Sequence, residues 1–316
     1  MAENLYIQFQ GGAHIIGDII KGCKNSNKSP ADVFSPFGQT VVYFGYLHYG
    51  PALRQVKVCT EGRDDAANSL WFAHLSRTLG QRATSHRSDE TICLATTLAF
   101  DVNALIQIKG SSGEETADKR MEKFLTLISG IPKGMIFHTN AHLTREGFRW
   151  APNTFMGGRT EEFWRDFDKR GGVSRFEGRH LRVVYPGMLC GPMKHTNYGR
   201  EFLVCVIQIP TIRCYKVKFS AIDGDDFKWE PGSYIGIITG ESSEGVSDAV
   251  LGVVKTVVSL ELPPVRPYDS PLLLDDVTVR CEGKCVVKEI RGTEGMDPQL
   301  YVPGRMMSEG QAWLVL

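Results

Sequence analysis

The sequence has no excess of charge of either sign. Its 316 residues include 36 Lys and Arg and 36 Asp and Glu, which gives a formal net charge of zero. Nucleic acids and anionic membrane surfaces attract proteins with a basic excess, so we expect neither as a partner. The longest apolar run, residues 41–49, is far shorter than the ~20 residues of a membrane-spanning helix. These absences predict an ordinary globular protein.

The sequence also lacks the signatures of several enzyme classes. It contains no glycine-rich phosphate loop ending in Lys-Ser or Lys-Thr, no G-x-G-x-x-G that opens a helix, and no G-x-S-x-G nucleophile elbow. The acidic run at residues 223–226 lacks the spacing and the closing Glu of a calcium-binding EF-hand loop. We therefore assign no catalytic residue and no cofactor, and we expect a protein that is not an enzyme.

The cysteines are scattered and mostly lie in apolar stretches, such as residues 92–94 and 204–206, which is typical of reduced thiols in a core. The eight are Cys23, Cys59, Cys93, Cys190, Cys205, Cys214, Cys281 and Cys285. No secretory leader pattern precedes them. This usage predicts a cytoplasmic protein with free thiols.

Helical periodicity is concentrated in the first half of the chain. We expect helices over residues 13–21, 64–80, 88–99 and 117–128. The last has the clearest apolar face, formed by Ala117, Met121, Phe124, Leu125 and Ile128. Phe124 should therefore point into a core. Gly130 and Pro132 should end this helix.

The second half is rich in Val and Ile and has the texture of strands. The predicted strands are residues 181–185, 201–209, 214–219, 234–239, 250–260, 277–281, 285–290 and 312–316. Gly283, between two Val-rich runs, predicts a hairpin turn over residues 281–285. We therefore expect an α+β fold. A mainly helical region, residues 1–133, should pack on a sandwich- or barrel-like β-rich domain, residues 159–316, through a junction at residues 134–158.

The junction holds the candidate metal ligands. His138, His142 and Glu146 are four residues apart, which would place them on one face of a helix, as in zinc hydrolases. The strand-like residues 135–137 and Gly147 argue instead for histidines in a loop. A second set, Cys190, His195, Cys281 and Cys285, lacks the close pairs of a structural zinc site. We expect no bound metal.

Arg149 and Trp150 have two interpretations. Trp150 alternates with Phe148, so both rings can lie on one side of an extended segment and anchor the two halves. Arg149 would then pair with a carboxylate or lie on an aromatic ring. In the alternative, a ligand-binding site would use His138, His142, Glu146, Arg149 and Trp150.

Four blocks carry a family resemblance. They read DETICLAT at residues 89–96, RMEKF at 120–124, GIPKGMIF at 130–137 and GFRWAP at 147–152. In order and spacing they resemble the region that follows the heterokaryon-incompatibility domain in large fungal proteins. The Ser-Tyr-x-Trp-Gly and Cys-Ile-Asn-Gln segments of the incompatibility domain itself are not in this sequence. The resemblance therefore implies a downstream or truncated piece of such a protein and transfers no functional residue.

The resemblance implies a non-enzymatic accessory or recognition region of a heterokaryon-incompatibility-like protein. A protein partner or an upstream domain would be its binding partner. The alternative is a small-ligand-binding protein or a hydrolase that uses residues 134–158 and the β-rich half.

Overall fold

The described residues fall into two units, residues 1–63 and 64–316. The computed structural model describes residues 6–9, 12–15, 84, 86–98, 100–128, 130–138, 140–157, 173–194, 200–208, 211–222, 224, 228–243, 246–255, 271, 273–290 and 301–316. In the first unit, β1 (Tyr6–Phe9) and β2 (Gly12–Ile15) pair antiparallel. The helix expected over residues 13–21 is therefore wrong at residues 13–15, because residues 6–9 provide a partner strand. The predicted helix at 64–80 lies outside the described residues.

Three helices open the described part of the second unit: α6 (Arg87–Thr97), α7 (Asn103–Ile106) and α8 (Gly113–Leu127). At the start of α8 the Ser112 hydroxyl accepts a hydrogen bond from the Glu115 amide at 3.1 Å, which caps the helix. The expectation that Phe124 points into a core is confirmed, since its side chain is 0% exposed. Its ring contacts Phe100 with the ring centroids 6.2 Å apart.

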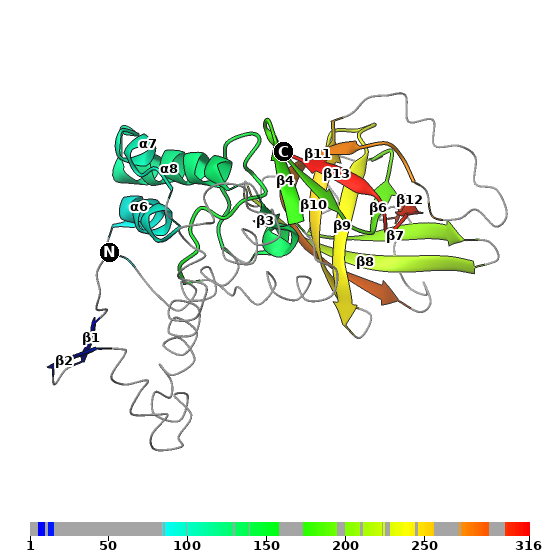
Figure 1. Ribbon diagram of the computed structural model, residues 1–316. Coiled ribbons are helices and arrows are strands. Elements are labelled where there is room, and N and C mark those ends of the chain that lie inside the picture. Colours follow the sequence, from blue (N-terminus) through cyan, green and yellow to red (C-terminus); the bar gives the residue numbers. More distant parts are fainter. Residues whose placement is uncertain are drawn as a thin grey trace, which may run out of the picture. The chain divides into compact units, whose positions relative to one another are not determined.

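Seven strands form a closed β-barrel (Figure 1). In order around the barrel they are β9 (Ile235–Ser243), β6 (Gly187–Cys190), β12 (Tyr301–Met307), β7 (Glu201–Gln208), β8 (Thr211–Ala221), β11 (Val277–Ile290) and β10 (Val246–Val254), which pairs again with β9. β12 and β7 are parallel, and the other neighbours in the ring are antiparallel. Closure leaves none of these seven strands at a sheet edge.

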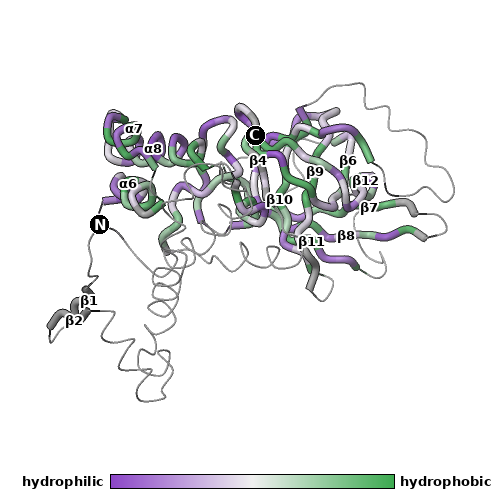
Figure 2. The backbone as a smooth tube through the Cα atoms, viewed as in Figure 1, coloured by the Kyte–Doolittle hydropathy of each residue, from purple (hydrophilic) through white to green (hydrophobic). Residues whose placement is uncertain are grey.

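Apolar side chains fill the barrel. Alternate residues of each strand point inward, and Figure 2 shows apolar and polar stretches following one another along β7 and β8. The inward strand residues include Phe202, Val217, Phe219, Ile235, Ile237, Leu251, Cys285, Val287 and Val302, all buried. Trp229, from the connection between β8 and β9, packs among them. The barrel is therefore a packed core.

A second layer covers part of the outside of the barrel. The first residues of β11 also pair with β13 (Ala312–Val315), followed by β5 (His180–Val184), β4 (Val173–Glu177) and the short β3 (Ile131–Pro132). Trp313 lies over Gly187 and Gly236 of the barrel. Its indole Nε1 donates to the Tyr185 carbonyl at 3.0 Å. The glycines leave room for this ring, so the layers can approach closely.

The predicted packing of a helical half on a β-rich half is wrong. In the described part of the chain 43% of residues are in strands and 21% in helices, and its three helices are short. The sheet begins at β3, inside the region expected to be helical. Residues 135–137, expected to be extended, belong to the 3-10 helix η1 (Lys133–Phe137). Local periodicity identifies single helices, but it does not show how far a helical region extends.

The predicted hairpin at residues 281–285 is also wrong, because β11 runs through these residues as one strand. It pairs with β10 on one side and with β8 on the other, so its backbone groups have partners on both sides. Gly283 allows the backbone of β8 to lie close to β11, since a Cβ at this position would be 2.1 Å from the Ser220 carbonyl oxygen. The register shifts opposite Leu251 and Gly252, which places Glu282 in a β-bulge.

We predict that Gly236→Ala destabilises the second unit by about 1–3 kcal/mol, as overpacking of a filled core does. An added Cβ would lie 2.8 Å from Trp313 Cζ3 and 2.9 Å from Val279 Cγ1. Gly113→Ala is the control, because a Cβ at Gly113 meets nothing within 4 Å. Urea unfolding measures both free energies. Equal midpoints for the two variants would contradict the close contact of the layers.

Candidate functional site

The candidate site residues lie on residues 131–157, named here the crossing segment, which packs against β11. After η1 the chain makes a tight loop in which His142 bridges to Pro152 and the Leu143 amide donates to the Ala151 carbonyl at 3.0 Å. The loop is not helical, so the four-residue spacing places no side chains on a common helical face. It brings together His138, His142, Arg149 and Trp150. Glu146 is exposed and outside this group.

The two histidine rings lie against each other and form hydrogen bonds with the backbone of residues 149–150. Their centroids are 4.5 Å apart. His138 Nε2 lies 3.2 Å from the Trp150 carbonyl oxygen, and His142 Nδ1 lies 2.6 Å from the Arg149 carbonyl oxygen. Because a carbonyl only accepts hydrogen bonds, each of these ring nitrogens carries the proton and donates it. The hydrogen bonds therefore fix a different tautomer for each ring.

Burial keeps both histidines neutral. It is the largest cause that lowers the pKa of His138 well below its usual value, followed by the positive charge of Lys284. The same two causes, in the same order, lower the pKa of His142 to about 4. At neutral pH these rings are hydrogen-bond donors to the backbone and carry no charge.

Arg149 joins the crossing segment to the bulge of β11. Its Nε donates to the Cys281 carbonyl at 2.8 Å, and a terminal nitrogen pairs with Glu282 Oε2 at 3.0 Å. The other carboxylate oxygen of Glu282 accepts from Arg280 Nε. Glu282 is only 1% exposed. One buried carboxylate is thus held between two guanidinium groups, an arrangement that a buried charge requires.

Trp150 is fully buried and offers no open face to a ligand. Its indole nitrogen donates to the Gly147 carbonyl at 3.0 Å. Its ring lies near Phe176 of β4, with centroids 6.4 Å apart, while Phe148 stacks on Phe176 at 5.3 Å. The aromatic residues of the crossing segment therefore pack on the second layer of the sheet.

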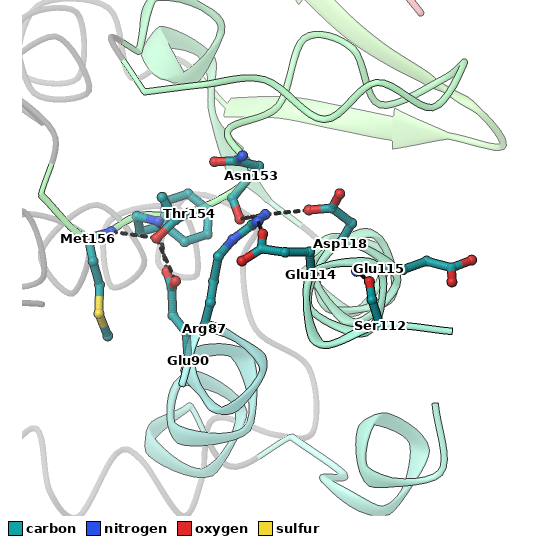
Figure 3. A network of polar contacts seen from close by, with 10 residues as sticks. Arg87, Glu90, Ser112, Glu114, Glu115, Asp118, Asn153, Thr154 and Met156 are labelled. Carbon is teal, nitrogen blue, oxygen red and sulfur yellow. Dashed lines mark hydrogen bonds and ion pairs between the residues drawn. The ribbon is translucent and has the colours of Figure 1, made fainter. Parts of the chain in front are cut away.

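A second polar network links the helices to the end of the crossing segment (Figure 3). Glu90, 1% exposed, accepts hydrogen bonds from the Thr154 hydroxyl at 2.6 Å and from the Phe155 amide at 2.7 Å. Burial raises the pKa of Glu90 despite these bonds. Arg87 donates to the Asn153 carbonyl at 3.0 Å and pairs with Glu114 and Asp118 of α8.

Two buried acids were missed by the sequence analysis. Glu90 was not predicted to be buried, although it lies one helical turn before the buried Leu94, which is a signal of burial. Glu282 gave no local signal, because it was assigned to a turn. Its partner Arg149 is 133 residues away in the sequence.

Two sets of side chains were considered as metal ligands. Among the described residues no group of three or more His, Cys, Asp and Glu side chains could hold a metal ion. Cys190, Cys281 and Cys285 are buried, and burial raises the pKa of Cys281 to about 12. His195, the fourth member of the set considered for zinc, lies outside the described residues. No helix in the described ranges is long and apolar enough to span a membrane.

Comparison of the chain with protein-family models, curated proteins and solved structures finds no match.

We predict that Glu282→Gln destabilises the second unit by about 3–5 kcal/mol, because the substitution breaks the buried ion pair with Arg149 by removing the carboxylate. Glu289→Gln is a matched control on the same strand. Glu289 is 47% exposed and its oxygen lies 3.9 Å from Arg213, so its loss should cost at most about 1 kcal/mol. Urea unfolding compares the two variants. Similar losses would show that the buried ion pair has no special role.

The two histidines predict a pH dependence of stability. Their pKa values are lowered in the folded protein, so the unfolded chain binds more protons than the folded one below about pH 6.5. The free energy of unfolding should therefore fall as the pH is lowered from about 6.5 toward the folded pKa of His142, which is about 4. The slope should be about 1.4 kcal/mol per pH unit for each histidine. Urea unfolding over this range measures it.

The control for this pH dependence is the double variant His138→Gln and His142→Asn, which keeps a donor near each ring nitrogen but removes the titration. Burial raises the pKa of Glu90 and Glu122, which stabilises the folded state as the pH falls, and this effect is common to all variants. The double variant should lose the histidine slope, and His180→Asn should keep it. An unchanged slope in the double variant would show that His138 and His142 do not cause the pH dependence.

Proposed function

We propose that this chain is a non-enzymatic accessory region of a heterokaryon-incompatibility-like protein, and that it recognises a protein partner in the cytoplasm without a cofactor. The observation that carries the proposal is the engagement of the candidate side chains inside the fold. His138 and His142 donate to backbone carbonyls, Arg149 pairs with Glu282, and Trp150 is buried. None of these four presents a free reactive group. The four sequence blocks that resemble the family support the same assignment.

The outer face of β8 and β11 is the surface we assign to recognition. The inward residues of these two strands include Val217, Phe219, Cys285 and Val287. Because side chains alternate along a strand, the residues next to them in sequence point outward. The outward set is Lys216, Lys218, Val286 and Lys288, and strand register places Lys218 opposite Val286 and Lys216 opposite Lys288.

This outer face is open to solvent and basic. Val286 is 40% exposed, and Ile212, on the same strand as Lys218 but six residues before it, is 67% exposed. Lys218 and Lys288 are exposed, whereas Lys216 is paired with Glu201 at 2.6 Å. An exposed apolar residue among lysines fits a protein partner whose surface is acidic around a small apolar contact.

We predict that the double variant Lys218→Glu and Lys288→Glu loses this partner, because its charges then repel an acidic surface. Proteins captured by the wild-type chain are compared with those captured by the double variant. The matched control, Lys109→Glu and Lys123→Glu, makes the same charge change at exposed positions outside the barrel. A partner that differs between the two variants is then purified and titrated. We expect at least about a tenfold weaker Kd for the barrel variant, with an unchanged Tm.

Two results would overturn the proposal. One is that every protein captured by the wild-type chain is captured equally by the two double variants. The other is a small molecule that native mass spectrometry finds on the wild-type chain and that Arg149→Lys removes. The second result would support ligand binding at residues 134–158.

A further inference from the structure

Two thiols lie side by side on the outside of the barrel. Cys205 of β7 and Cys214 of β8 are direct cross-strand partners, and their Sγ atoms are 3.1 Å apart. Val204, Val206 and Val217 point into the barrel, so both cysteines point outward. Cys205 is partly exposed, while Cys214 is 5% exposed.

The backbone at this pair already suits a disulfide. Directly opposed residues of antiparallel strands have Cα atoms about 4.5 or 5.5 Å apart, and disulfides are found at Cα separations of about 4.4–6.8 Å. A covalent bond would therefore need rotation of the side chains and only a small approach of the strands. Among the other described cysteines, Cys93 is exposed and Cys190, Cys281 and Cys285 are buried.

We propose that Cys205 and Cys214 form a reversible disulfide when the chain meets a small oxidising disulfide such as oxidised glutathione. The sulfur of Cys205, the more exposed of the two, attacks one glutathione sulfur and releases the first glutathione thiol. The sulfur of Cys214 then attacks the Cys205 sulfur of the mixed disulfide and releases the second. Two protein thiols are oxidised to a disulfide, and one glutathione disulfide is reduced to two thiols. The two released glutathione thiols take up the two protons that the protein thiols lose.

The environment of the two cysteines makes their reaction with a disulfide slow. Burial, followed by the hydrogen bond with Cys214, raises the pKa of Cys205 to about 12. Thiolate is the attacking species, and little is present at neutral pH. The pair therefore responds to sustained oxidation and is not suited to rapid catalysis. This inference is independent of the proposed recognition of a partner.

Tryptic mapping tests the bond directly. Cleavage after Arg200, Arg213 and Lys216 releases residues 201–213 and 214–216, each of which carries one of the two cysteines. The full chain is equilibrated with a series of glutathione redox buffers, free thiols are blocked with an alkylating reagent, and the protein is digested without reduction. We expect these two peptides to appear cross-linked under oxidising buffers and to separate again when a thiol reductant is added.

Variants and a stability measurement complete the test. Cys205→Ser and Cys214→Ser should each abolish the cross-linked peptide. Cys93→Ser should leave unchanged the redox potential at which half of the Cys205–Cys214 pair is oxidised. The oxidised wild type should unfold at a Tm higher by roughly 5–10 °C, as expected for a cross-link across a short loop in a domain of this size. The proposal is overturned if Cys93 becomes glutathionylated while Cys205 and Cys214 stay reduced. A persistent mixed disulfide on Cys205, without transfer to Cys214, would also overturn it.

Discussion

Burial of the Glu282 carboxylate is the constraint on which the rest of the described structure depends. At 1% exposure it needs charged partners, which Arg149 and Arg280 provide. Because Arg149 belongs to the crossing segment, the ion pair fixes where that segment lies on β11. The segment's backbone carbonyls then orient the two histidine rings, and its far end bonds to Glu90 of α6. One buried charge thus sets the position of the segment that connects the helices to the sheet.

Such an ion pair need not add to net stability. Desolvation of two ions costs several kcal/mol for each, and this cost often cancels their attraction. Any shift of the crossing segment that separates Arg149 from Glu282 would, however, break a buried ion pair, and the lost attraction would not be replaced by water. Apolar contacts such as that of Trp150 with Phe176 discriminate less between alternative positions of the crossing segment, because burial of apolar surface is not directional. We therefore interpret the ion pair as the selector of one arrangement and the buried rings as the larger source of stabilisation.

The sequence predicted the features that depend on neighbouring residues. α8 was found from its apolar face and its stop signals, and β7, β8 and β9 overlap Val- and Ile-rich runs. Closure of the barrel depends on pairs between distant strands, such as β12 with β6 and β7, and no local pattern encodes these. The site shows the same limit. The histidines and Arg149 stood out by residue type, but their partners could be identified only once the crossing segment had been placed on β11.

The bulge at Glu282 explains why β11 could not be interpreted from its sequence. From Val277 to Val287 its odd-numbered residues are apolar or small on both sides of the bulge, so the pattern shows no change of face. Before the bulge, Val279 points out of the barrel toward the second layer, where a Cβ on Gly236 would meet it. After the bulge, Cys285 and Val287 point into the barrel. An extra residue moves every later side chain to the opposite face. Because the second layer buries one face and the barrel interior buries the other, the two faces need the same residue types. Burial alone therefore leaves no trace of the bulge in the sequence, and only the buried Glu282 marks it.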